Sequence, residues 1–400
     1  MTLQDKTRSP LRNAAALVLA ASSVVACIGG SAIAAPLTVA DVVVDDLANP
    51  RGIIVGPDGA IYVAEAGSGG DGPSIVSGSG AELFYGLTGA VTRLSDGMHE
   101  SVVSGLPSLA LPDGSEATGI HDLAFGPDGT LYGVIGFGAD PSLRDGLGGT
   151  AGSGLLGQLV AITPDGVTPV ADLAAFELAS NPAGDDPNSN PYSVVATPEG
   201  WVVADAGGND LLLVAPDGTI STRAVLDPEP NPLPFGPPFY QSVPTGTALA
   251  PDGSVLVVQL TGFPFPEGGA DVFSVDASGL ISSLAGGFTN LIDVAVGPDG
   301  AIFALEFDSD SLINPGLTGS LWQIDDLGVR TLLYAGLLNP TGVAVGPDGR
   351  IYVVENGLSP DGGRVLALGA AVPLPGAMAL MASGLAGLGL VRARRRSSTA

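Results

Sequence analysis

Cysteine, lysine and histidine are almost missing from this chain of 400 residues. It contains one cysteine, Cys27, and two histidines. A single cysteine excludes a disulfide framework, so the fold must be held by packing. Between Ala35 and Pro375 the chain has seven arginines, no lysine and 40 acidic residues, a net charge of −33. This charge disfavours nucleic acid and anionic lipid as partners.

Motifs of the common catalytic classes are missing too. The sequence has no G-x-S-x-G nucleophile elbow, no glycine-rich phosphate loop between a strand and a helix, and no Cys/His cluster. These absences favour a non-catalytic protein and leave an enzyme of another class open.

A repeated β-hairpin organises what is present. The turn Gly56-Pro57-Asp58-Gly59 lies between the apolar runs Ile53–Val55 and Ile61–Val63, and proline presets its first dihedral angle while glycine can adopt a positive φ. The same hairpin recurs around Pro57, Pro127, Pro198, Pro251, Pro298 and Pro347. This spacing leaves room for two further strands after each hairpin. The sequence therefore predicts an all-β fold, a six-bladed β-propeller of four-stranded antiparallel blades over residues 35–370.

The last repeat lacks a closing strand, because Gly363–Leu368 is followed by a different kind of segment. An extra strand precedes the first hairpin at Val39–Leu47. We expect this N-terminal strand to pair with Gly363–Leu368 and close the ring, which would remove open sheet edges.

Both ends of the chain have the pattern of targeting segments. Residues 1–34 combine a basic start, an apolar run and Ala32-Ile33-Ala34, which predicts a signal peptide cleaved after Ala34 by signal peptidase. Lipidation of Cys27 at a loose lipobox is the alternative. Residues 371–396 contain an apolar run that could just span a membrane, followed by Arg392–Arg396, which would place the propeller outside the cytoplasm.

The second of these segments resembles a known sorting signal. Val372-Pro373-Leu374-Pro375, an apolar small-residue helix and an arginine cluster are similar to the VPLPA variant of the PEP-CTERM signal, with Gly376 in place of the usual alanine. The resemblance implies an exosortase-type protease as a partner, a transmembrane helix before processing, and an exported protein at the cell surface, outside the cell or in the periplasm.

Long insertions are expected on one face of the propeller, which we call the long-loop face. The tight Pro-containing turns all belong to the opposite face, since strands alternate in direction. The insertions lie mostly over the first four blades, where long loops commonly carry function. They are residues 67–89, 107–119, 136–157, 174–190 and 227–243.

The channel mouth on the long-loop face is the predicted site. The second strands end there in Glu65, Ile135, Asp205, Gln259, Glu306 and Glu355. Such carboxylates can accept hydrogen bonds from neighbouring backbone amides, which is a structural role. They can also bind Ca²⁺, which takes about 6–8 oxygen ligands, and gluconolactonase and paraoxonase-type propellers build metal sites in this way. The metal candidates are Glu65, Asp205, Asp293, Glu306 and Glu355, with Asn190 and Asn290 as further oxygen donors.

Two other groups of candidates lie near the same mouth. His121 and the adjacent Asp122 are the candidate catalytic residues, with the imidazole as a base. Candidate ligand-binding residues at the starts of the first strands are Arg51, Tyr192, Asn190, Asn290 and Asn339.

The central repeats resemble a family of exported propellers. The stretches starting at Ala117, Ser189, Gln241, Leu260 and Gly287 are similar to the ScyD/ScyE family of NHL-like propellers, over about residues 49–368. The resemblance implies an extracytoplasmic six-bladed propeller but brings no catalytic residue. Three functions remain: a binding or scaffold protein that contacts a polysaccharide, an exported small molecule or another exported protein; a calcium-dependent lactonase or other hydrolase; and an accessory protein of scytonemin-like pigment biosynthesis.

Overall fold

The computed structural model describes residues 37–370, except residues 96, 164–165, 315 and 317. The predicted signal segment 1–34 and the sorting segment 371–396, with its membrane helix, lie outside these residues. None of the helices described is long and apolar enough to cross a membrane.

Six antiparallel sheets form the blades of a β-propeller, as the repeats predict. Each of the first five blades takes four consecutive long strands of the chain. Their bounds are β2 (Pro50–Val55), β3 (Ile61–Glu65), β5 (Glu82–Ser95) and β6 (Met98–Ala110); β7 (Ile120–Phe125), β8 (Leu131–Ile135), β9 (Gln158–Thr163) and β10 (Gly166–Asp172); β11 (Pro191–Thr197), β12 (Gly200–Asp205), β13 (Asp210–Val214) and β14 (Ile220–Val225); β17 (Pro244–Leu249), β18 (Val255–Gln259), β19 (Ala270–Val275) and β20 (Ile281–Phe288); β21 (Leu291–Val296), β22 (Ile302–Glu306), β23 (Thr318–Ile324) and β24 (Arg330–Leu338).

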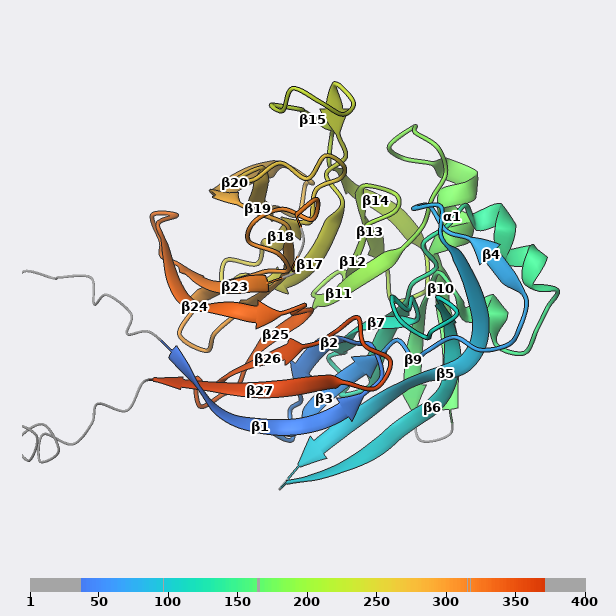
Figure 1. The fold of residues 1–400 in the computed structure, drawn as a ribbon, viewed down its shortest axis with the longest axis horizontal. Helices are drawn as coiled ribbons and strands as arrows, with labels where there is room; N and C mark the ends of the chain where they lie inside the picture. Colours follow the sequence, from blue (N-terminus) through green and yellow to red (C-terminus); the bar gives the residue numbers. More distant parts are fainter. Residues whose placement is uncertain (1–36, 96, 164–165, 315, 317, 371–400) are drawn as a thin grey trace, which may run out of the picture. The chain divides into compact units, whose positions relative to one another are not determined.

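The sixth blade joins the two ends of the described chain. It contains β25 (Gly342–Val345), β26 (Ile351–Glu355), β27 (Gly363–Ala370) and the N-terminal β1 (Leu37–Leu47). β1 lies beside β27 (Figure 1) and pairs with it in antiparallel orientation. In this pairing Val42 lies opposite Leu366. The predicted closure by the first strand is therefore confirmed.

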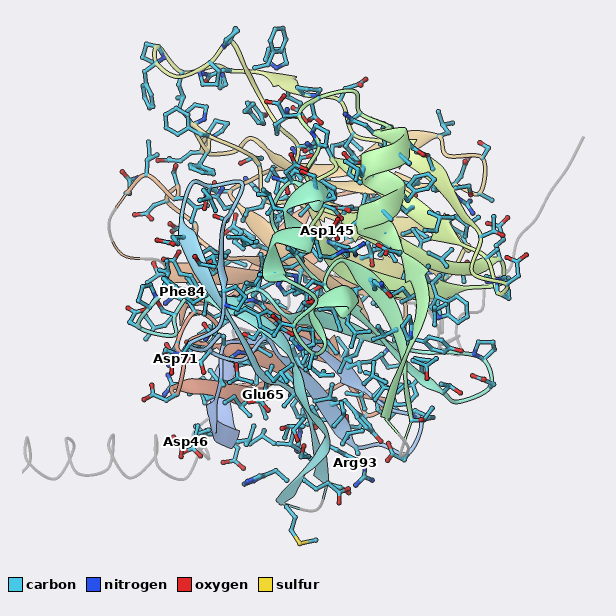
Figure 2. The ribbon with its side chains drawn as sticks, turned by 90° about the vertical axis from the view of Figure 1, so that its right-hand side faces the viewer. Asp46, Glu65, Asp71, Phe84, Arg93 and Asp145 are labelled. Atoms are coloured by element: carbon cyan, nitrogen blue, oxygen red, sulfur yellow. The ribbon has the colours of Figure 1, made fainter. Side chains whose placement is uncertain are left out.

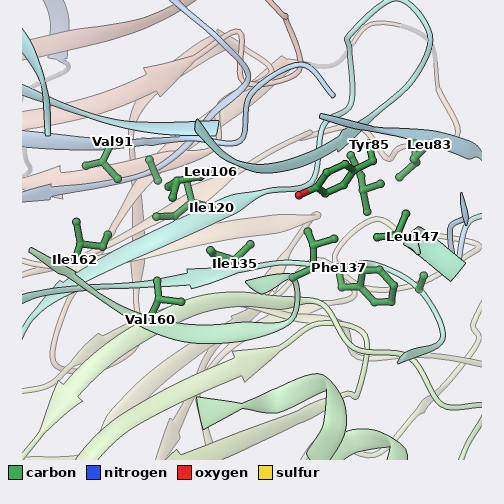
Figure 3. Packing of buried hydrophobic residues seen from close by; sticks show 14 of the residues in the cluster. Leu83, Tyr85, Val91, Leu106, Ile120, Ile135, Phe137, Leu147, Val160 and Ile162 are labelled. Atoms are coloured by element: carbon green, nitrogen blue, oxygen red, sulfur yellow. The ribbon is translucent and has the colours of Figure 1, made fainter. Parts of the chain in front are cut away.

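The first strands of the blades surround the central channel. Each contacts the first strand of the next blade, and β25 contacts β2, so the ring is complete. Apolar side chains fill the space between neighbouring blades. Figure 3 shows this packing between the first two blades, where Val91 and Leu106 face Ile120, Ile135 and Phe137.

The repeated turns have the conformation that the sequence predicts. Gly59 has φ 77°, and the Asp58 Oδ1 atom accepts a hydrogen bond from the Ala60 N–H at 3.1 Å. The same local bond follows in four other turns, at Asp128, Asp252, Asp299 and Asp348.

The long-loop face contains more regular structure than the sequence indicates. β5 and β6 extend past the blade as a ribbon in which Phe84 lies opposite Ala110. Two residues of β5 stabilise this ribbon: the side chains of Leu83 and Tyr85 are buried. The Tyr85 hydroxyl also donates a hydrogen bond to the Ala151 carbonyl at 2.7 Å. Further short elements occupy the insertions: β4 (Ser74–Val76), η1 (Pro141–Leu147), η2 (Ser153–Leu155), α1 (Leu173–Ser180), β15 (Glu229–Pro230) and β16 (Phe239–Tyr240).

Candidate functional site

The carboxylates that end the second strands bind backbone amides. Glu65 accepts from the Ala48 N–H at 2.9 Å, Glu306 from the Thr289 N–H at 2.9 Å, and Glu355 from the Leu338 N–H at 2.7 Å. Each donor immediately precedes an asparagine that leads into a first strand. Figure 2 shows Glu65 between Phe84 and Arg93, which lie toward opposite ends of the β5–β6 ribbon. These carboxylates have the structural role that the sequence allows.

The same carboxylates are dispersed among their own blades. Asp205 accepts from the backbone N–H groups of Asn190, Gly207 and Gly208, and Glu355 pairs with Arg364 at 2.6 Å. Among the residues described, no three or more His, Cys, Asp and Glu side chains form a group that could hold a metal ion. The predicted calcium ion at the channel mouth therefore stays a prediction.

Two of the three candidate asparagines, Asn290 and Asn339, and the equivalent residue Asn49 form turns. Asn49, Asn290 and Asn339 have φ between 42° and 45°, a left-handed conformation that asparagine tolerates. The Asn290 side chain donates to the Leu260 carbonyl at 2.7 Å and accepts from the Leu312 N–H at 3.2 Å. The structure does not bring Asn290 or Asn339 into the mouth cavity described below, so their positions suit the shaping of loops.

Two aspartates lie inside the channel, below the mouth. The Asp122 Oδ2 atom accepts from the Val194 N–H and the Ser193 hydroxyl, both at 2.9 Å. Asp293 accepts from the Val343 N–H at 2.8 Å. Each carboxylate thus links its blade to the next one.

Glycines make room for these two aspartates. A Cβ atom on Gly52 would lie 2.3 Å from the Asp122 Oδ1 atom, and a Cβ atom on Gly246 would lie 2.4 Å from the Asp293 Cα atom. Burial raises the pKa of Asp122, and burial together with the charge of Asp122 raises the pKa of Asp293. The pairing of a glycine with a carboxylate in the neighbouring blade is a signal that the sequence contains but that we did not recognise.

A cavity of about 230 Å³ opens at the mouth, above these aspartates. Three of the five predicted ligand-binding residues, Arg51, Asn190 and Tyr192, line it, together with the candidate catalytic residue His121. The other lining residues are Glu116, Ala117, Thr118, Leu260, Ile292, Phe307, Thr341 and Leu358. The cavity is mainly apolar and has a few polar groups, as small-molecule sites commonly do.

His121 is a buried, neutral imidazole. Its Nδ1 atom lies 3.2 Å from the Pro191 carbonyl, which can only accept, so Nδ1 carries the proton and Nε2 accepts from the Thr118 hydroxyl at 3.0 Å. Burial, and then the charge of Arg51, lowers the pKa of His121 to about 3. Asp122 bonds to the next blade and makes no hydrogen bond to His121, so the two predicted catalytic residues do not form a dyad.

Arg51 is 5 % exposed and supplies a positive charge to the cavity wall. Its guanidinium group donates to the backbone carbonyls of Gly357 and Ala117. It takes part in none of the ion pairs among the described residues. Carbonyl oxygens satisfy hydrogen bonds without neutralising the charge, and the Glu116 carboxylate in the same wall acts on Arg51 without pairing with it. The guanidinium group can therefore bind an anionic group of a ligand.

Tyr192 offers a second polar group. Its ring packs against His121, with 5.1 Å between the ring centroids. Within the part of the chain that the structure describes, its hydroxyl makes no hydrogen bond, and burial raises its pKa. A neutral hydroxyl on the cavity wall can donate to a ligand oxygen.

Sequence reasoning missed Glu116 and Thr118 at this site. They lie in the 107–119 insertion, and Glu116 adopts φ 53°. Thr118 comes three residues before His121 and faces the same cavity. Insertion residues cannot be placed from a repeat alignment, because the other blades have no equivalent.

A second cavity, of about 520 Å³, opens at the opposite end of the channel. It is lined by the apolar first strands and by the Pro57 and Pro127 turns, with Asp122 and Asp293 at its inner end. The two aspartates therefore separate the two cavities.

Solved structures resemble this chain at low sequence identity. A gluconolactonase from Xanthomonas campestris has a TM-score of 0.50 and 9% identity over 84% of this chain and 95% of that chain. A protein of unknown function from Bacteroides thetaiotaomicron has a TM-score of 0.50 and 10% identity over 84% of this chain and 76% of that chain. A virginiamycin B lyase from Staphylococcus aureus has a TM-score of 0.44 and 14% identity, over 82% and 98% of the two chains.

These similarities establish the fold and no activity. No protein-family model matches this chain, and neither does any curated protein sequence. The structural neighbours are propeller proteins, which agrees with the six blades observed here.

Proposed function

We propose that this protein is a non-catalytic binding propeller that holds a small molecule in the mouth cavity of the long-loop face. The observation that supports this most is Arg51, a buried cation in the cavity wall that takes part in none of the ion pairs among the described residues; the Glu116 carboxylate of the same wall acts on it only at longer range. The ligand is an anionic small molecule with an apolar body.

The cavity matches both parts of such a ligand. Arg51 and the Tyr192 hydroxyl can bind an anionic oxygen group, while Leu260, Ile292 and Phe307 can contact the apolar body. Because the chain is strongly acidic elsewhere, the positive charge at the mouth distinguishes this position from the rest of the surface.

We further propose that the protein works outside the cytoplasm, as a ScyD/ScyE-like propeller exported by its signal peptide and sorted by an exosortase-type protease. The N-terminal and C-terminal sequence patterns support this placement.

Calorimetric titration of the full chain with benzoate, and with benzyl alcohol as a neutral probe of similar size, tests the binding function. We expect one benzoate site and much weaker binding of the alcohol. Tyr192→Phe should weaken benzoate binding about 3- to 10-fold, the usual range for one hydrogen bond.

Tyr132→Phe is the matched control, because Tyr132 packs on Trp201 at a centroid distance of 4.4 Å and does not line the mouth. It should leave the affinity unchanged. Equal binding of the alcohol, no response to Tyr192→Phe, or binding of an oligosaccharide in place of benzoate would refute this proposal.

A further inference from the structure

Buried oxygen atoms without partners gather at a second place on the long-loop face, beside the turn between β12 and β13. Thirteen buried polar side-chain atoms of the described residues lack a hydrogen-bond partner. Six of them belong to this place: Glu177 Oε1, Asp185 Oδ1, Asn188 Oδ1, both carboxylate oxygens of Asp210, and Gln241 Oε1. We call these five residues the α1 cluster.

The members of the α1 cluster adjoin the same turn. A Cβ atom built on Gly208 would lie 3.3 Å from the Glu177 Oε2 atom and 3.4 Å from the Asp210 Oδ1 atom. A Cβ atom built on Gly207 would lie 2.7 Å from the Asn188 Oδ1 atom. Two glycines therefore leave space between the turn and these oxygens.

The remaining members are held beside the turn by hydrogen bonds. The Asp185 Oδ2 atom accepts from the Asn209 side chain at 3.3 Å and from the Gln241 side chain at 3.2 Å. Both amides donate to Asp185, which leaves the Gln241 Oε1 atom and the Asp185 Oδ1 atom without a donor.

Burial makes the negative charge at this place costly. Glu177 is 2 % exposed and Asp210 is 1 % exposed. None of the ion pairs in the described part of the chain includes a member of the α1 cluster. A buried carboxylate without donor or counter-charge is strongly destabilising, so a cation or a proton must compensate it.

Without a cation, these carboxylates raise one another's pKa. Burial, followed by the charges of Asp205 and Glu177, raises the pKa of Asp210 to about 9. Burial and the charge of Asp205 also raise the pKa of Glu177 to about 7. Asp205 itself is satisfied by Ser189 and backbone amides, so it adds charge without being a free ligand.

We propose that the α1 cluster binds one Ca²⁺ ion through the carboxylates of Glu177 and Asp210 and the amide oxygens of Asn188 and Gln241, with Asp185 holding the Gln241 side chain in place. Ca²⁺ takes 6–8 oxygen ligands in flexible geometry and accepts mixed carboxylate and amide donors. The carboxylates alone do not form a group of three that could hold a metal ion; the two amide oxygens complete the set. This site is separate from the channel mouth.

The ion would join three segments of the long-loop face. Glu177 lies on α1, Asn188 in the segment that leads into β11, and Asp210 at the start of β13. The same leading segment ends at Asn190, which lines the mouth cavity, and His121 contacts the Pro191 carbonyl. Ca²⁺ would therefore stabilise one wall of the mouth.

Calorimetric titration of the full EGTA-treated chain with CaCl₂, combined with thermal unfolding, tests this proposal. We expect one site per chain and a higher melting temperature with Ca²⁺, since a ligand that binds the folded state stabilises it. Asp210→Asn should weaken Ca²⁺ binding at least 10-fold. Without Ca²⁺, however, this variant should melt at or above the temperature of the unsubstituted protein, because it removes a buried carboxyl group that lacks hydrogen-bond donors.

Glu306→Gln is the matched control, because Glu306 is equally buried but bonds to Thr289 and Ser309. It should leave Ca²⁺ affinity unchanged. No heat of Ca²⁺ binding, or binding that persists in Asp210→Asn and is lost in Glu306→Gln, would overturn the proposal, and the second result would place calcium at the channel mouth. Benzoate binding is measured separately, so either proposal can fail alone.

Discussion

At the scale of single residues, the channel aspartates make the most distinctive contribution. Asp122 and Asp293 are buried on the first strands of the second and fifth blades, and each bonds to the backbone of the next blade. A charged carboxylate in this position repels its counterpart, so the protonated form is favoured when the protein is folded.

This arrangement predicts a pH dependence for Asp122→Asn. The pKa of Asp122 rises from its usual 3.8 to about 6 in the folded protein. The protonated Asp122 carboxyl therefore contributes fully to the free energy of unfolding below pH 3.8. This contribution is lost as the pH rises through about 6, where the carboxyl ionises in the folded protein. Relative to Asp122→Asn, the unsubstituted protein should lose roughly 1–3 kcal/mol of unfolding free energy between pH 4 and pH 7.

Urea unfolding at each pH measures this difference. Asp128→Asn is the control, because Asp128 is exposed and its pKa is lowered by the Thr130 N–H and hydroxyl, so the difference for this variant should have the opposite sign. Parallel stability curves for the unsubstituted protein and Asp122→Asn would show that Asp122 is ionised normally.

The sequence could predict some residues of the mouth but not their grouping. Arg51, Tyr192 and Asn190 follow from the repeat alignment, because each lies at the start of a first strand. The separation of His121 from Asp122 could have been predicted, since adjacent residues in a strand point in opposite directions. The α1 cluster combines residues from two insertions with a blade turn, and no local pattern relates them.

At the scale of elements, strand β1 connects the two ends of the ring. The sequence predicts this pairing because the last repeat lacks one strand, and the structure confirms it from Leu37 to Leu47, with three shifts of register along the way. By contrast, the extension of β5 and β6 could not be predicted, because its stability depends on contacts of Tyr85 with the distant η2 region.

Leu47→Ala tests the contribution of β1. Leu47 is 4 % exposed and packs among the apolar residues between the sixth and first blades. Its truncation should lower the free energy of unfolding by about 2–5 kcal/mol. It should also increase amide exchange in β27, the strand that β1 covers.

Val42→Ala on the same strand provides the comparison. Val42 is 45 % exposed, so its truncation should change stability by less than about 0.5 kcal/mol. If both variants behave alike, or if β27 exchanges at the same rate in all three proteins, β1 does not close the ring in solution.

At the scale of the whole molecule, closure of the ring separates two environments along one channel. The long-loop end has a small cavity with Arg51 and Tyr192, and the turn end has a wider apolar cavity. Asp122 and Asp293 lie between them. A fold does not determine a function, so the proposed binding function depends on the residues of the mouth and not on the architecture.

Crystals of the full chain soaked in 3-bromobenzoate provide the most direct measurement, because the anomalous signal of bromine locates the ligand without ambiguity. The account predicts one bromine peak inside the mouth cavity, with the carboxylate directed at Arg51 and Tyr192. A peak confined to the wide cavity at the turn end, or no peak at a concentration that saturates binding in solution, would contradict it.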